Sequence, residues 1–92
     1  MTAKKSKSEG MTKDQMIHEV RDIVCGQSPM QYAVYRREGK KWHRIDWGIG
    51  RPLRENYPSD ALIFQHDRNK CRLLDASEIV EQEIKKGLIF HD

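Results

Sequence analysis

The chain has 92 residues, of which 37% are hydrophobic and 34% are charged, and its net charge at pH 7 is +3. This composition favours a small soluble globular domain over a disordered chain, and the length allows only a modest core. No apolar run approaches the roughly 18–20 residues that span a bilayer, which excludes a transmembrane segment and argues against a membrane partner.

The first ten residues differ from the rest. Residues 1–10 are polar, carry three lysines and lack apolar anchors, which predicts a disordered basic tail ahead of one α+β domain over residues 11–92. Because the tail also lacks the apolar stretch of a secretory signal, we expect a cytoplasmic protein. One disulfide between Cys25 and Cys71 is possible, but in that compartment two reduced, partly buried thiols are the better interpretation.

A helix is predicted directly after the tail. Thr12 as N-cap and Gln15 three residues later match a capping box, which satisfies two backbone amides at the start of a helix. Apolar residues then recur at helical spacing on a single face: Met16, Ile17, Val20, Ile23 and Val24. We expect Gly26 to end the helix, because glycine adopts the left-handed conformation at little cost.

A β-hairpin is predicted next, from residues 30–37 and 40–47 around a turn that contains Gly39. Alternation sorts the side chains onto two faces. One face is mostly apolar and holds Tyr32, Val34, His43, Ile45 and Trp47. The other is aromatic and basic and holds Tyr35, Arg37, Trp42 and Arg44.

The second half predicts an irregular loop, another hairpin and a helix. Residues 48–60 contain two glycines and two prolines, which break both periodicities. Residues 61–65 and 70–74 are interpreted as paired strands around a turn at 66–69. Asp75 and Glu78 resemble a capping box, and Gly87 is expected to end the last helix. The apolar residues Leu88, Ile89 and Phe90 then either dock as a short edge strand, which we favour, or contact a partner.

The resulting fold class is α+β. We expect a four-stranded antiparallel sheet made from two hairpins. The N-terminal and C-terminal helices are expected to pack on one face of that sheet and to leave the other face in contact with water.

Positive charge is concentrated between residues 36 and 54, where seven Lys and Arg residues stand against two acidic residues. The seven are Arg36, Arg37, Lys40, Lys41, Arg44, Arg51 and Arg54. Such a cluster suits an anionic partner, and the aromatic rings of Tyr35 and Trp42 would offer stacking platforms for unpaired bases. The simpler alternative is a solvated strand face on which these two rings only stabilise the hairpin.

Catalytic and metal sites find little support in the sequence. The four histidines and two cysteines lack the short spacing of structural zinc ligands. Cys25 is expected at a helix C-terminus, where the dipole raises the pKa of a thiol and so opposes its activation. Residues 48–50 lack the Gly-Lys-Ser/Thr of a phosphate loop. We therefore expect neither an enzyme nor a cofactor.

Three binding roles remain open. The first is association with nucleic acid through a basic, aromatic hairpin face over residues 35–54. The second is a regulator or inhibitor that docks the same face onto an acidic protein surface, because Tyr, Trp and Arg are also enriched at interface hot spots. The third is self-association through Leu88, Ile89 and Phe90 or through an open sheet edge.

Overall fold

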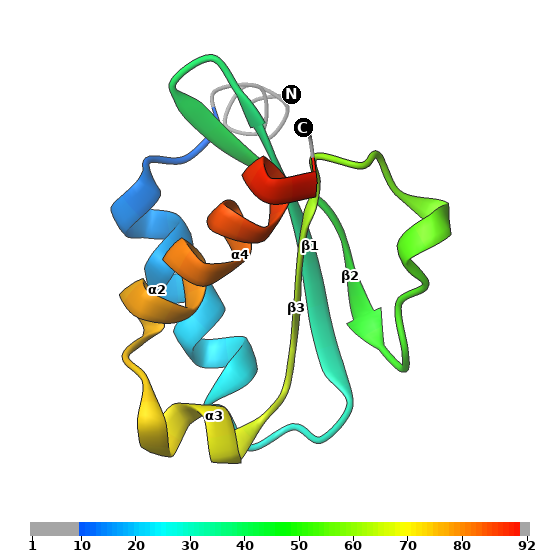
Figure 1. Cartoon of the computed structure of the whole chain (residues 1–92). Coiled ribbons are helices and arrows are strands. Elements are labelled where there is room, and N and C mark those ends of the chain that lie inside the picture. Colours follow the sequence, from blue (N-terminus) through cyan, green and yellow to red (C-terminus); the bar gives the residue numbers. More distant parts are fainter. Residues whose placement is uncertain (1–9, 91–92) are drawn as a thin grey trace, which may run out of the picture.

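A computed structural model gives the structure of the chain and describes residues 10–90, with side chains described to residue 86. Figure 1 shows an α+β fold in which helices lie on one side of a twisted antiparallel sheet. The elements in chain order are α2 (Lys13–Val24), β1 (Gln31–Glu38), β2 (Lys41–Ile49), the 3-10 turn η1 (Arg54–Asn56), β3 (Leu62–Gln65), α3 (Arg68–Leu73) and α4 (Ala76–Phe90).

The predicted first helix is confirmed as α2. The Thr12 hydroxyl accepts from the Gln15 backbone N–H, and the Gln15 side chain accepts from the Thr12 N–H, as a capping box requires. Four residues of the predicted apolar face are buried: Met16, Val20, Ile23 and Val24. The helix ends with Cys25 as C-cap. Gly26 is not left-handed, so that expectation is wrong, but a Cβ at this position would collide with the carbonyl oxygen of Asp22.

The first hairpin is also confirmed. β1 and β2 pair antiparallel, and Gly39 in the turn has a φ of 65°, which glycine adopts without a steric penalty. The register shifts between Val34 and Tyr35, so that Val34 lies opposite Asp46 whereas Tyr35 lies opposite Arg44. A β-bulge of this kind leaves one extra residue on β2, here Ile45, and changes the face of every residue that follows on that strand.

The sheet has three strands in the order β2-β1-β3, so the prediction of four strands is wrong. The stretch expected to be the fourth strand, residues 70–74, falls mostly in α3. The Asp67 side chain accepts from the Lys70 backbone N–H at 3.1 Å and thereby caps a helix where we expected a hairpin turn. Leu73, at the end of α3, has 81% of its surface exposed.

The last helix begins as predicted, with the Asp75 backbone N–H donating to the Glu78 carboxylate at 2.9 Å. Gly87 does not end it, because the backbone of α4 stays helical to Phe90. The prediction of a short edge strand at residues 88–90 is therefore wrong, and the side chains of those residues lie outside the described ones. The predicted disordered tail likewise lies outside the described residues, except for Gly10.

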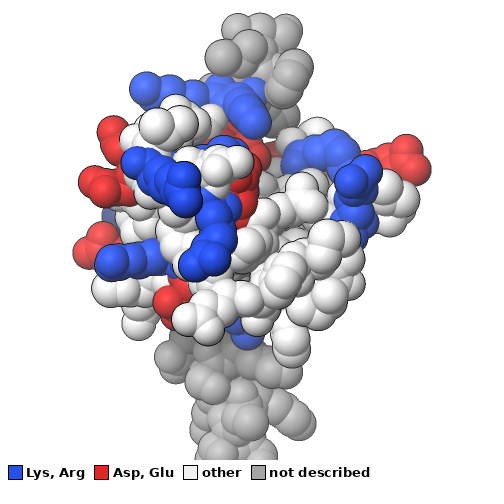
Figure 2. Space-filling view, turned by 90° about the horizontal axis from the view of Figure 1, so that it is seen from below, with Lys and Arg blue, Asp and Glu red and all other residues white. Residues whose placement is uncertain are grey.

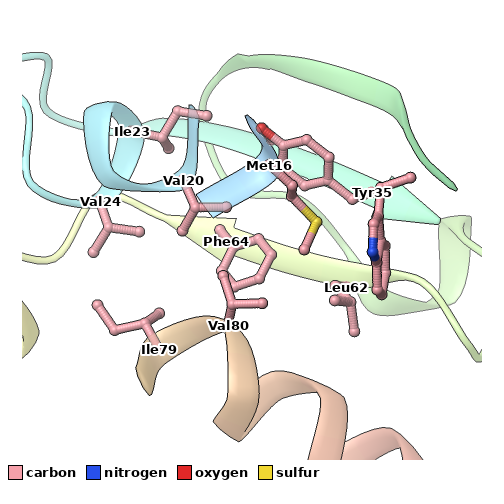
Figure 3. Packing of buried hydrophobic residues seen from close by; sticks show 11 residues of the cluster. Met16, Val20, Ile23, Val24, Tyr35, Leu62, Phe64, Ile79 and Val80 are labelled. Carbon is pink, nitrogen blue, oxygen red and sulfur yellow. The ribbon is translucent and has the colours of Figure 1, made fainter. Parts of the chain in front are cut away.

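The core lies between the sheet and the pair α2 and α4. Figure 3 shows Tyr35 and Phe64 of the sheet beside Met16 and Val20 of α2. The rings of Tyr35 and Phe64 meet edge to face with their centroids 5.9 Å apart, a favoured aromatic geometry. α4 completes the same cluster with Ile79 and Val80, and Trp42 belongs to it from β2.

The opposite face of the sheet is only partly open to water. Figure 1 shows the segment that carries η1 on the side of the sheet away from the helices. Val34 on that face has no exposed surface, and the Tyr57 hydroxyl donates to the carboxylate of Asp46 on β2. The irregular residues 50–60 therefore form a second, thinner layer. The expectation that this face of the sheet contacts water is wrong at the centre of the sheet.

The two cysteines form a disulfide, which corrects the expectation of reduced thiols. Cys25 follows α2 and Cys71 lies in α3, with their Cα atoms 5.7 Å apart, well within the range that a disulfide spans. The bond fastens α3, which has no buried residue of its own, to the end of α2.

Candidate binding surface

The two aromatic residues predicted to stack on bases are buried. Tyr35 has no exposed surface and Trp42 only 6%. The register does place Tyr35, Arg37, Trp42 and Arg44 on one face, as predicted, but α2 and α4 cover that face. Alternation groups side chains by face and does not say which face the helices choose. Tyr35 and Trp42 therefore belong to the core and are removed from the candidate surface.

Tyr35 also explains the position of one predicted arginine. Its hydroxyl donates to the Glu19 carboxylate on α2 at 2.8 Å, and Arg44 donates to the same oxygen at 3.0 Å. Burial raises the pKa of Tyr35, and the hydrogen bond to Glu19 raises it further, so the hydroxyl stays protonated. Arg44 thus ties the sheet to α2 through an intramolecular ion pair with Glu19, which neutralises part of its charge.

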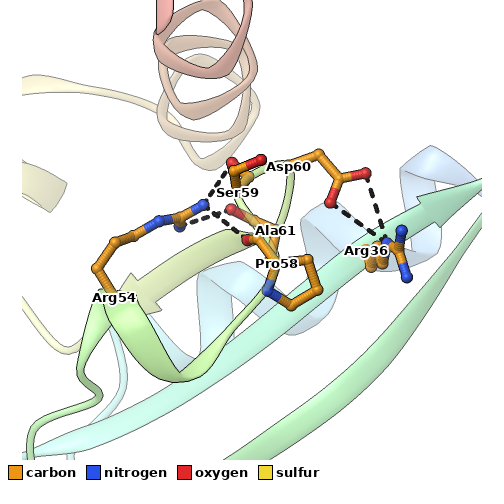
Figure 4. Close-up of polar contacts among 6 residues, drawn as sticks. All are labelled: Arg36, Arg54, Pro58, Ser59, Asp60 and Ala61. Carbon is orange, nitrogen blue, oxygen red and sulfur yellow. Dashed lines mark hydrogen bonds and ion pairs between the residues drawn. The ribbon is translucent and has the colours of Figure 1, made fainter. Parts of the chain in front are cut away.

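Two further arginines hold the segment that carries η1 (Figure 4). Arg54 donates to the carbonyl oxygens of Ala61 at 2.7 Å, Pro58 at 3.0 Å and Ser59 at 2.6 Å. Arg36 forms an ion pair with Asp60 at 3.3 Å. These contacts fold residues 54–61 back toward the sheet, so both arginines act first as structural residues.

The other predicted basic residues are exposed. Arg37, Lys40 and Lys41 surround the turn of the first hairpin, and Arg51 follows β2. Arg37 donates to the Gly39 carbonyl at 2.9 Å and lies over the ring of Trp42. Among the described residues, none of these four makes an ion pair. They form the positively charged part of the surface.

The strand β2 also carries an exposed apolar patch, whose residues were not among the predicted site residues. We define the β2 patch as Ile45, Trp47 and Ile49, whose exposed fractions are 43%, 62% and 69%. Beyond the bulge, Trp47 lies opposite Ala33 and Ile49 opposite Gln31, on the helix side of the sheet but away from the core cluster. The Arg44 guanidinium lies 5.5 Å from the centroid of the Trp47 ring, a cation–π distance.

The β2 patch lies along an open sheet edge. Among the described residues, only Met11 pairs with the outer side of β2, and it does so at Trp42 alone. Met30, itself 54% exposed, lies beside the end of the strand, where its carbonyl accepts from the Gly50 N–H. Figure 2 views the molecule from below and shows a broad uncharged area with charged residues of both signs at its margins.

Asp46 fixes the backbone within the β2 patch. Its carboxylate accepts from the hydroxyls of Tyr57 and Tyr32 and from the backbone N–H of Trp47, the last at 2.9 Å. These hydrogen bonds, that from Tyr57 above all, lower the pKa of Asp46. The same contact raises the pKa of Tyr57. The exposed Trp47 is therefore presented from a backbone that is held in place.

Comparisons with known proteins give no relative from which a role could be inferred. No protein-family model matches the chain, and neither the curated proteins nor the solved structures give a match. No helix of the described residues is long and apolar enough to cross a membrane. Within the same part of the chain, no three His, Cys, Asp or Glu side chains are grouped so that they could hold a metal ion.

Proposed function

We propose that the protein is a binding module that docks onto another protein through the β2 patch and the basic residues around it. The exposure of Trp47 at 62% on an open edge strand carries the proposal. Tryptophan and arginine are the residues most enriched at interface hot spots, and Trp47 lies against Arg44. Exposed apolar side chains beside a strand edge with open backbone groups are typical of a surface that a partner covers.

Charge indicates the kind of partner. Arg37, Lys40, Lys41 and Arg51 are exposed near the two ends of β2, and no described residue neutralises them through an ion pair. An acidic surface would complement them, with charge raising the rate of association and the apolar patch supplying most of the affinity. This is the regulator or inhibitor role that the sequence suggested. The exposed ring of Trp47 now replaces the buried rings of Tyr35 and Trp42 as its aromatic contact.

The test compares two exposed apolar side chains. Full-length chain is immobilised as wild type, as Trp47→Ser and as Leu73→Ser, and each is exposed to an extract of the source cells. Leu73 is the matched control because it is 81% exposed but lies on α3. We expect a partner that binds the wild type and Leu73→Ser but not Trp47→Ser, with a loss of about 2 kcal/mol or more. Equal retention by all three would contradict the proposal.

Nucleic acid remains a second candidate because Arg37, Lys40 and Lys41 gather at one hairpin turn and Trp47 offers an exposed ring on the same strand. Fluorescence anisotropy with single- and double-stranded DNA and RNA at about 50 and 200 mM salt tests it. Binding that falls by orders of magnitude with salt, and that Lys40→Glu with Lys41→Glu weakens alike for all sequences, would favour this role. No binding at low salt would rule it out.

The other expectations from the sequence stay predictions. A non-enzymatic role belongs to this proposal, as does self-association through Leu88, Ile89 and Phe90. The expected cytoplasmic location is opposed by the disulfide between Cys25 and Cys71, because disulfides are rare in a reducing cytosol. Self-association is checked by sedimentation over a range of concentrations, with a chain truncated before Leu88 as the comparison.

A further inference from the structure

Within the described part of the chain, the second edge strand of the sheet, β3, also has backbone groups without a hydrogen-bond partner. In an antiparallel ladder, alternate residues direct their N–H and C=O groups toward the neighbouring strand. The His66 N–H donates to the Gln31 carbonyl on the β1 side, so Phe64 and Leu62 face β1 as well. The intervening residues Ile63 and Gln65 therefore direct their backbone groups outward, away from the sheet.

Two open cavities meet along this edge. The larger, of about 600 Å³, lies between β3, α4 and the segment before β3, and its apolar wall includes Pro52, Ala61 and Ile63. The smaller, of about 260 Å³, lies on the helix side, where Phe64 and Ile79 line it together with charged residues that include Asp67, Lys70 and Glu83. Ile63 and Gln65 line both cavities, so the outward backbone groups lie where the cavities meet.

The two cavities suit an added strand. Side chains of an extended segment alternate between the two faces of a sheet, so successive side chains of such a segment would enter the two cavities in turn. Backbone hydrogen bonds to the edge give affinity in this mode of recognition, and the flanking pockets select the side chains. A strand next to Ile63 and Gln65 would also satisfy the donors and acceptors that β3 leaves open.

Charge in the larger cavity favours a carboxylate. Its charged lining residues are Arg54, Lys86 and Glu83, and Lys86 lies 3.5 Å from Glu83. The Arg54 guanidinium is held by backbone carbonyls, and within the described part of the chain it has no carboxylate partner. The lining therefore keeps one positive charge that an acidic side chain would neutralise.

We propose that the β3 edge binds an extended peptide segment of another protein, added as an outer strand, with an acidic side chain in the larger cavity beside Arg54 and Lys86. This site is separate from the β2 patch, because β1 lies between the two edge strands. It goes beyond the proposed function, which does not depend on it.

The test uses ¹⁵N-labelled full-length chain and two synthetic peptide pools. Each pool holds acetylated, amidated heptapeptides that alternate apolar residues with threonine, one with a central aspartate and one with a central lysine. We expect the aspartate pool to shift the amide resonances of Ile63 and Gln65, and the lysine pool to bind about tenfold more weakly. Shifts confined to β2, or no shift with either pool, would overturn the proposal.

Gln65 provides a matched pair of variants. Gln65→Pro removes an outward N–H from an exposed edge position without removing a bond to β1, whereas Gln65→Ala keeps that N–H. We expect the proline variant to lose peptide binding and the alanine variant to keep it. Should Gln65→Pro fail to fold, Lys86→Glu, which alters only an exposed side chain, is expected to weaken the aspartate pool selectively. Unchanged binding by a folded Gln65→Pro would overturn the proposal, and so would unchanged binding by Lys86→Glu if Gln65→Pro does not fold.

Two controls separate peptide binding at β3 from docking at the β2 patch and from self-association. Trp47→Ser should bind the aspartate pool as the wild type does, so failure of the β2 proposal and failure of this one are distinguishable. Sedimentation over a range of concentrations should give the same masses for the unliganded wild type and for Gln65→Pro. A mass that rises with concentration and falls back in Gln65→Pro would show that a second copy occupies the edge, and would overturn the peptide assignment.

Discussion

Trp42 and Trp47 lie on the same strand and on the same face of the sheet, yet their surroundings are opposite. Trp42 is opposite Arg37 and 6% exposed, whereas Trp47 is opposite Ala33 and 62% exposed. Trp42 belongs to the cluster beneath the helices, and Trp47 lies at the other end of β2, outside that cluster. The face on which a side chain lies therefore does not determine its burial, because the helices cover only part of the sheet.

The largest expected effect is at Trp42. Trp42→Ala removes a buried aromatic ring and leaves a cavity, which we expect to lower the free energy of unfolding by about 3–5 kcal/mol. Guanidinium denaturation followed by circular dichroism measures this loss. A loss below about 1 kcal/mol would mean that Trp42 is exposed in solution, and the contrast between the two tryptophans would fail.

The sequence predicted those parts of the fold that depend on local signals. The capping box at Thr12, the apolar face of α2 and the first hairpin are all found. The prediction failed where contacts between residues far apart in the sequence determine the structure. Asp67 caps a short helix that a disulfide fastens to α2, and no local pattern brings Cys25 and Cys71, 46 residues apart, into contact.

The candidate surface was predicted less well than the fold. The cluster of charge between residues 36 and 54 is real, but Arg36, Arg44 and Arg54 turn out to be held by internal contacts. The rings chosen for stacking are buried, because the choice required knowing which face the helices cover. Strict alternation placed Trp47 on the face of Tyr32 and Val34. The bulge at Ile45, which alternation alone does not predict, places Trp47 on the opposite face.

A smaller effect is expected at Asp46, which holds the backbone beside Trp47. Asp46→Asn keeps the size of the side chain but removes the charge that accepts from Tyr57, Tyr32 and the Trp47 N–H. We expect a loss of about 1–2 kcal/mol in the free energy of unfolding at pH 7. Asp60→Asn is the control, since its ion pair with Arg36 is exposed and is expected to contribute about 0–1 kcal/mol.

The effect at Asp46 should depend on pH in one direction. Its pKa in the folded chain is lower than in the unfolded chain, where an aspartate has a pKa of about 3.9. The stabilisation is therefore fully present above about pH 4 and is lost as the pH falls through the folded pKa. Denaturation of the wild type and of Asp46→Asn side by side should show a difference in the free energy of unfolding at pH 7 that disappears in acid. A difference that stays constant with pH would mean that altered packing, and not the lost charge, destabilises Asp46→Asn.

The smallest effect is expected at Trp47, and it is the most informative about function. Its ring is mostly in water and its one described aromatic contact is with Arg44, so Trp47→Ala should change the free energy of unfolding by no more than about 0.5–1 kcal/mol. The same denaturation experiment used for Trp42→Ala measures it.

A large exposed ring that adds so little to stability needs a reason for its place on a rigid strand, and docking onto a partner supplies one. If Trp47→Ala instead cost as much as Trp42→Ala, the ring would be covered in solution, and the difference between the two ends of β2 would disappear. A small cost together with the loss of a partner would separate the two tryptophans completely, with Trp42 acting in folding and Trp47 in binding.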